Sequence, residues 1–285
     1  MVKHEGVGRG GVGEGAGLCP PPPPQTFQKS IIEVGRRAAL AAGAVLRQNY
    51  RRPQRITLKG VIDPVTESDL KAQEIIMALI RQAFPEHSFL AEESVAEEGA
   101  KGQRWIIDPL DGTVNFAHGF PVFCVSIAYE GTTGVEYGVV YDPLRDELFE
   151  AFKSGGAWLN GGEIRVSETD NLERALLATG FPYDIRGRLG GTMARLGRVL
   201  SQVQGVRRAG SAALDLCYVA CGRLDGFWEE NLKPWDTAAG ALMVAEAGGR
   251  LTTFDGGVFE LTSANVAASN GRLHEAILRL LRDDR

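Results

Sequence analysis

Hydrophobic positions along the chain follow two different periods, which predict helices in some stretches and strands in others. Between residues 30 and 50, and again after Thr66, apolar side chains recur every three or four positions, as on an amphipathic helix. Short runs of β-branched and aromatic residues predict strands, and Asp142-Pro143 and Asn160-Gly161 are typical of hairpin turns. We expect a mainly antiparallel sheet with helices covering one face. Its strands are predicted at 88–91, 105–107, 122–129, 135–141, 147–152 and 158–164.

From about residue 166 onward, predicted strands and helices alternate along the sequence. No internal repeat or long linker separates the two halves. We therefore expect one α/β domain of the α+β type over residues 26–285, with subdomains at about 26–165 and 166–285. Strands of the second half are predicted at 175–179, 206–208, 225–228, 250–252 and 265–269, and helices at 193–203, 212–221, 237–247 and 273–281.

The first 25 residues have a different composition from the rest of the 285-residue chain. They are rich in glycine and end in five consecutive prolines at 20–24. Such a segment cannot bury enough apolar surface to offset the entropy lost on ordering. We predict a disordered tail at 1–25 that takes no part in the chemistry.

Charge and apolar content exclude several classes of protein. A net charge of -5 gives no basic surface for direct nucleic-acid binding, and the small basic spots at Arg51-Arg52 and Arg207-Arg208 are expected to be solvated. No apolar stretch reaches membrane-spanning length, and the N-terminus lacks the apolar region of a signal peptide. The four cysteines form no CxxC pair and are expected to be reduced. We expect a cytoplasmic protein with no membrane or nucleic-acid partner.

The stretch 105–116, WIIDPLDGTVNF, carries the strongest chemical signal. A buried strand is expected to stop at Asp108, and Asp111 follows on a short turn. Two neighbouring carboxylates raise each other's pKa unless a cation neutralises them, and a metal ion would do so. Gly112 permits close backbone approach, and Thr113 can cap a following helix whose N–H groups attract phosphate. Taken alone, the stretch is equally compatible with a strand, an Asp-Pro turn and a capped helix without any ligand.

Three further carboxylates stand where one element gives way to the next. Asp69 follows Thr66 at capping-box spacing, Glu92 follows a short strand, and Asp236 stands at the start of a helix. Each has an ordinary structural explanation. Acting together with Asp108 and Asp111, they would form an oxygen-only site that suits Mg²⁺ shared with a substrate phosphate, whereas zinc would call for His or Cys.

Four motifs resemble those of the inositol monophosphatase family. The stretch 105–116 resembles the first signature of the family, and 234–240 (PWDTAAG) with 246–249 (EAGG) resembles the second. AEES at 91–94 and VTESD at 65–69 resemble its other metal-binding segments, so the resemblance runs from about residue 28 to the C-terminus. It implies a layered αβαβα sandwich of the fructose-1,6-bisphosphatase/inositol monophosphatase type. It also implies a lithium-sensitive, Mg²⁺-dependent phosphomonoesterase that is usually a homodimer.

The same resemblance implies roles for individual residues. Two to three Mg²⁺ ions would be held by Asp69, Glu92, Asp108, the carbonyl of Leu110, Asp111 and Asp236. The first ion would lie between Glu92, Asp108 and Leu110, the second between Asp108, Asp111 and Asp236, and a weaker third between Asp69 and Glu92. Glu92, Thr113 and Asp69 are the expected catalytic residues, with Thr113 beside Glu92 orienting a metal-activated water.

Substrate contacts follow from the resemblance in the same way. Backbone N–H groups of Gly112 and Thr113 would bind phosphate oxygens, and Glu229 would accept hydrogen bonds from ring hydroxyls. Lys59 either reaches the site on its loop or is solvated. The full set of expected substrate contacts is Asp111, Gly112, Thr113, Gly210, Ser211, Ala212, Glu229 and Asp236.

The sequence is compatible with more than one substrate and with either a catalytic or a regulatory role. Related phosphatases act on histidinol phosphate, fructose 1,6-bisphosphate or adenosine bisphosphate, but residues 115–121 and Trp228-Glu229 look more like the inositol branch. We therefore predict hydrolysis of myo-inositol 1-phosphate, a small phosphorylated polyol. Some bacterial relatives act in transcription antitermination, so a regulatory protein with a transcription partner is the second hypothesis.

Overall fold

The computed structural model describes residues 29–53, 55–58, 64–97, 99, 102–182 and 184–282. The predictions for the tail at 1–25 and for Lys59 lie outside these residues. Among the described helices, none combines the length and apolar content that crossing a bilayer requires.

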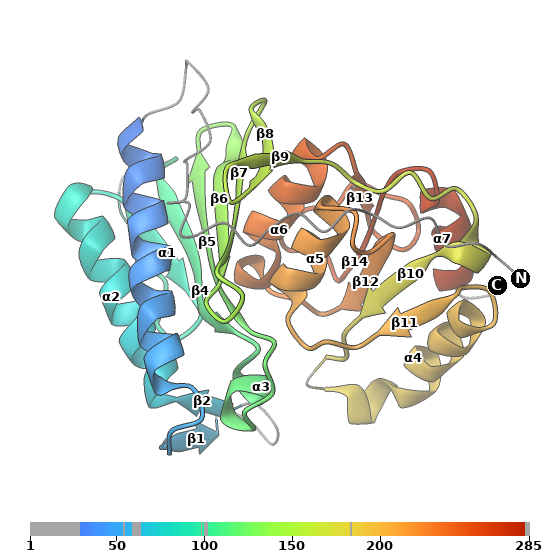
Figure 1. Cartoon of the computed structure of the whole chain (residues 1–285), viewed down its shortest axis with the longest axis horizontal. Helices are drawn as coiled ribbons and strands as arrows, with labels where there is room; N and C mark the ends of the chain where they lie inside the picture. Colours follow the sequence, from blue (N-terminus) through green and yellow to red (C-terminus); the bar gives the residue numbers. More distant parts are fainter. Residues whose placement is uncertain are drawn as a thin grey trace, which may run out of the picture.

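Two long helices form the first layer. Helix α1 (Lys29–Asn49) buries a stripe of small and aliphatic side chains, and α2 (Glu67–Ala83) packs beside it. Thr66 and Asp69 form the predicted capping box at the start of α2. Figure 1 shows both helices against one face of the larger sheet.

That sheet has seven strands in the order β3-β4-β5-β6-β7-β8-β9. Only the β3–β4 pair among its described strands is parallel, as the hairpin pattern of the sequence predicts. Its strands are β3 (Ser88–Ala91), β4 (Arg104–Asp111), β5 (Cys124–Gly131), β6 (Gly134–Asp142), β7 (Glu147–Phe152), β8 (Gly156–Leu159) and β9 (Gly162–Ile164).

Helices α5 (Ala212–Ala220) and α6 (Pro234–Glu246) form a middle layer between the two large sheets. Their alanine-rich faces join one apolar core with both sheets. The seven-stranded sheet is therefore covered by helices on both faces, and the expectation of one covered face is wrong. The sequence pattern did not show that helices from the second half return to this sheet.

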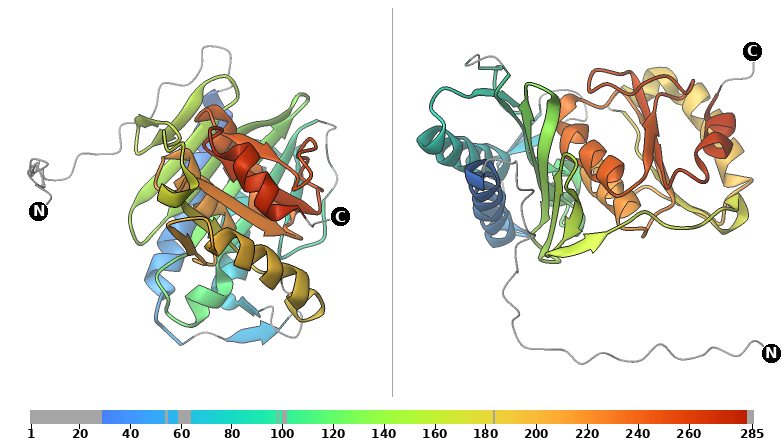
Figure 2. Two further views of the ribbon diagram at one scale, coloured as in Figure 1. Left: turned by 90° about the vertical axis from the view of Figure 1, so that its right-hand side faces the viewer. Right: turned by 90° about the horizontal axis from the view of Figure 1, so that it is seen from above.

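The second sheet and two outer helices complete the fold. The sheet has the order β11-β10-β12-β14-β13, and α4 (Ile185–Leu200) and α7 (His274–Leu281) pack together on its outer side. Figure 2 shows the resulting succession of helix and sheet layers from two further directions, which confirms the αβαβα sandwich. The strands are β10 (Leu176–Thr179), β11 (Gly205–Arg207), β12 (Gly226–Glu230), β13 (Arg250–Thr252) and β14 (Asn265–Ser269).

Several boundaries differ from the prediction. Helix α4 starts at Ile185, eight positions before the predicted start at residue 193. The prediction missed its first part because residues 185–192 are rich in glycine and arginine and lack an apolar period. The sequence pattern also missed the short pair β1 (Ile56–Leu58) and β2 (Pro64–Thr66) and the short helix η1 (Leu172–Arg174).

Candidate active site

The strand β4 does not stop at Asp108 but continues to Asp111. Asp108 is paired with Ser126 and Asp111 with Cys124, so three steps on β4 oppose two on β5. This irregularity falls at the proline between the two acids, since proline has no N–H for the ladder. The prediction that the strand ends at Asp108 is therefore wrong, and both carboxylates stand on a distorted strand end.

Asp108 lies at the centre of the acidic group. Its side chain is buried, and the N–H of Leu110 donates to Oδ1 over 3.0 Å. Burial raises the pKa of Asp108 well above its usual range, and the charges of Glu92, Asp111 and Asp236 raise it further. A carboxyl in this position gains from a neighbouring cation.

Asp111 and Asp236 connect the strand end to the middle helices. The hydroxyl of Ser211 and the N–H of Ala213, at the start of α5, donate to Asp111 Oδ2 over 2.6 and 2.8 Å. The N–H of Lys233 donates to Asp236 Oδ2 over 2.6 Å at the start of α6. Burial raises the pKa of both acids, and the charge of Asp111 adds to the shift at Asp236.

One pocket of about 470 Å³ brings the predicted residues together. Glu92, half-buried at the end of β3, faces it together with the two acids of β4 and the acid of α6. As the side chains stand, no three acidic, His or Cys groups among the described residues are close enough to enclose a metal ion. The predicted residues that line the pocket are Glu92, Asp108, Leu110, Asp111, Gly112, Thr113, Gly210, Ser211, Ala212, Glu229 and Asp236.

Asp69 does not line the pocket but lies behind Thr113. The hydroxyl of Thr113 donates to Asp69 Oδ1 over 2.8 Å, while the N–H and hydroxyl of Thr66 donate to Oδ2. Burial raises the pKa of Asp69 to about 6, against the opposing effect of these hydrogen bonds. The prediction that Thr113 caps the next helix, α3 (Thr113–Ala117), is wrong. The N-cap residue of α3 is Gly112, whose φ of 102° favours glycine.

Glu229, on β12, also lines the pocket. Its side chain is only 9% exposed, and burial with the charges of Asp236 and Asp215 raises its pKa well above the usual range. Arg208 is the nearby cation that opposes this shift. Arg208 and Asp215 also line the pocket, although neither was predicted as a site residue from the sequence. Arg208 looked like a solvated basic spot, and Asp215 occupies an ordinary position in an apolar helix.

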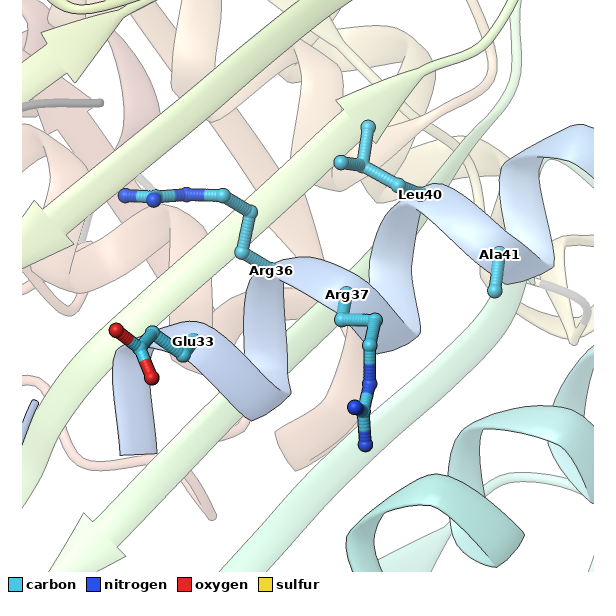
Figure 3. A pocket seen from close by; sticks show the side chains of 5 residues that line it. All are labelled: Glu33, Arg36, Arg37, Leu40 and Ala41. Atoms are coloured by element: carbon cyan, nitrogen blue, oxygen red, sulfur yellow. The ribbon is translucent and has the colours of Figure 1, made fainter. Parts of the chain in front are cut away.

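A second hollow, of about 510 Å³, lies along α1. Figure 3 shows that all five side chains lining it come from this one helix. Arg36 is held there by Glu150, with Nε and Nη2 donating to the carboxylate over 3.0 Å. The arginine is thus committed to a structural ion pair, and the hollow has no cluster of acids comparable to the first pocket.

Two known proteins are similar in sequence to about nine-tenths of this chain. An inositol-1-monophosphatase from Mesorhizobium japonicum is 43% identical over 258 residues, or 90% of this chain and 97% of the relative. The Nus factor SuhB from Escherichia coli K12 is 42% identical over 257 residues, or 89% of this chain and 96% of the relative.

Solved structures agree. The extragenic suppressor protein suhB from Bartonella henselae superposes with a TM-score of 0.87 at 43% identity, covering 90% of this chain and 100% of that one. A structure described as an IMPase/NADP phosphatase complexed with Mg²⁺ and phosphate has a TM-score of 0.74 at 26% identity, covering 86% and 92%. The model of the inositol monophosphatase family matches residues 28–285. The chain therefore belongs to the inositol monophosphatase family of phosphatases.

Proposed function

We propose that this protein is a Mg²⁺-dependent phosphomonoesterase that hydrolyses myo-inositol 1-phosphate to myo-inositol and phosphate. The observation that carries the proposal is that four predicted acids from three separate segments line one pocket together with Thr113 and Glu229. The name of the 43% identical relative supports the substrate, and the Mg²⁺ and phosphate in the 26% identical structure support the cofactor.

The donor set of the pocket fits Mg²⁺. Its candidate ligands are carboxylates and one carbonyl oxygen, which hard divalent cations prefer, and buried acids whose pKa values are raised by one another gain from a cation. Glu92, Asp108 and the carbonyl of Leu110 would hold one ion, and Asp108, Asp111 and Asp236 a second. A third ion near Asp69 stays a prediction, since Asp69 is buried behind Thr113 and does not line the pocket.

The chain's own groups would position the reactants. When bound, Mg²⁺ acidifies water and neutralises charge on the phosphoryl group. Because the Thr113 hydroxyl donates to Asp69, its oxygen is available to accept a hydrogen bond from the attacking water. The water oxygen would bond to phosphorus, the bond from phosphorus to the inositol oxygen would break, and that oxygen would take up the proton that the attacking water gives up. The N–H groups of Gly112 and Thr113 would hold the phosphate oxygens.

A further set of pocket residues would select the alcohol. Glu229 is a buried carboxylate that can accept hydrogen bonds from ring hydroxyls, and Gly210, Ser211 and Ala212 line the same pocket. An alcohol without those hydroxyls would leave the carboxylate unpaired, so the site should discriminate against it.

A phosphate-release assay tests this function. We expect myo-inositol 1-phosphate to be hydrolysed faster than histidinol phosphate, fructose 1,6-bisphosphate or adenosine bisphosphate, with activity dependent on Mg²⁺ and lowered by Li⁺. Equal or better turnover of fructose 1,6-bisphosphate would overturn the substrate choice but leave the reaction class intact.

We infer further that the protein acts in the cytoplasm as a homodimer. Three cysteines of the described chain, Cys124, Cys217 and Cys221, are free thiols, which suits a reducing compartment. The dimer is the usual state in the family that the sequence motifs indicate. Size-exclusion chromatography with light scattering measures it directly.

A regulatory role is the second candidate, because the 42% identical relative is named as a Nus factor. The net charge of -5 disfavours direct nucleic-acid binding but is compatible with a protein partner. Pull-down with purified transcription factors, repeated with Asp108→Asn, separates the two roles: a regulatory contact survives the substitution, while catalysis does not.

A further inference from the structure

Gly180 lies directly beside Glu229, the residue expected to recognise the alcohol. It follows β10, which pairs in parallel with β12 so that Thr179 is aligned with Trp228. The hydroxyl of Thr179 donates to the carbonyl of Trp228 over 2.8 Å and holds the two strand ends together. Gly180 and Glu229, which come directly after Thr179 and Trp228, are therefore neighbours, and both line the pocket.

The carboxylate of Glu229 occupies the space that a side chain at position 180 would need. A Cβ atom on Gly180 would have three nearest neighbours, the Cδ and both carboxylate oxygens of Glu229, all far inside the 3.4 Å where ordinary van der Waals contact begins. The backbone of Gly180 is not in the left-handed region, so its conformation does not require glycine. The absence of a side chain at position 180 therefore leaves room for the Glu229 carboxylate.

Adding a side chain here would move the carboxylate rather than the backbone. The clashing atoms are the end of a flexible side chain, which can change rotamer, whereas β10 and β12 are fixed by their ladder. Movement toward Asp215 or Asp236 is opposed by the like charges of these acids, which also raise the pKa of Glu229.

We propose that Gly180 determines the substrate specificity of this site, because only glycine leaves room for the Glu229 carboxylate to lie against the strand end and face the alcohol. This inference rests on the proposed function, in which Glu229 binds ring hydroxyls. Gly180 touches no reacting atom and acts through Glu229.

The test compares two substrates that differ only in hydroxyl groups, myo-inositol 1-phosphate and cyclohexyl phosphate. Gly180→Ala should lower kcat/KM for the inositol ester by about ten- to a hundredfold, chiefly through KM, since it removes the hydrogen bonds between the ring hydroxyls and Glu229. For cyclohexyl phosphate the change should stay within about threefold, since that ester has no hydroxyls to lose. Gly197→Ala on α4, where a Cβ would meet nothing within 4 Å, is the matched control and should behave as wild type.

A double-mutant cycle identifies the route of the effect. If Gly180 acts through Glu229, Gly180→Ala combined with Glu229→Ala should be no worse than Glu229→Ala alone. The double variant should also recover any thermal stability lost in Gly180→Ala, because the clashing carboxylate is gone. Independent, additive losses would overturn the inference, as would equal losses on both esters.

A crystal structure of Gly180→Ala gives a readout that does not depend on activity. The Glu229 carboxylate should be displaced from the position it has in the wild type, and an unmoved carboxylate would refute the proposal. The wild-type enzyme decides the proposed function separately. If it fails to prefer the inositol ester, the substrate assignment is lost, while the displacement in the crystal still decides whether Gly180 sets the position of Glu229.

Discussion

Asp108 has surroundings that local structure alone does not explain. A single hydrogen bond from the Leu110 N–H explains its turn geometry, but not its burial among the charges of Glu92, Asp111 and Asp236. Burying like charges together costs free energy, and a fold that retains such a group has a use for it. A cation at the proposed site would neutralise this buried charge, which a capping role does not require.

Replacing this central acid separates chemistry from stability. Asp108→Asn removes a candidate bridging ligand and relieves repulsion, so kcat/KM should fall by about a thousandfold or more while the unfolding free energy stays equal or rises. Phosphate release and urea unfolding measure the two effects. A fully active variant would contradict the metal assignment, and a variant that loses its circular-dichroism spectrum would mean that the residue is structural.

Asp69 makes the stability of the protein depend on pH. Its pKa rises from 3.8 to about 6 in the fold, so the folded state binds this proton more tightly than the unfolded chain. The stabilisation that Asp69 contributes to the fold is complete below about pH 3.8 and is lost as the pH rises through about 6, a change of about 3 kcal/mol in the unfolding free energy. In EDTA, wild-type stability should therefore fall more between pH 4 and 6.5 than that of Asp69→Asn. If urea unfolding gives the same change in unfolding free energy with pH for both proteins, Asp69 does not titrate in this way.

The elements differ in how well their sequences predicted them. Strands of the first sheet have clear apolar runs and turn residues, and the Thr66–Asp69 capping box was visible in the sequence. The end of β4 was misplaced because an Asp-Pro-Leu-Asp segment ordinarily terminates a strand, and only pairing with β5 extends it. Asp236 could be linked to Asp108 through family motifs alone, since no local pattern reveals which helix returns to which sheet.

The contact between α6 and β6 brings Asp236 to the strand end, and glycine makes it possible. A Cβ on Gly138 would lie 2.9 Å from the Cα of Ala239, which is backbone and cannot move aside. Gly138→Val should therefore lower the unfolding free energy by about 1–3 kcal/mol through overpacking, and should reduce kcat by displacing α6. Urea unfolding and phosphate release measure this against the open control Gly197→Ala. Wild-type stability and activity in Gly138→Val would mean that the helix position does not set the site.

The pocket as a whole is assembled from both sheets and the helix layer between them. Strand β4 contributes two acids, α6 contributes Asp236, and β12 contributes Glu229. No one of these elements carries a complete donor set, so the site exists only in the folded chain. Its ligand should therefore be linked thermodynamically to the folding of the entire molecule.

Adding Mg²⁺ should stabilise the whole protein against heat. A ligand present at a hundred times its Kd for the folded state contributes about 2.7 kcal/mol, which for a chain of this size is roughly 5 °C in Tm. The same addition to Asp108→Asn should give a much smaller rise, because a shared ligand is missing. Sodium chloride at matched ionic strength controls for general screening of the acidic surface. Equal rises in both proteins, or with sodium chloride alone, would show that the ion does not bind between these carboxylates, and the phosphatase mechanism would then lose its nucleophile.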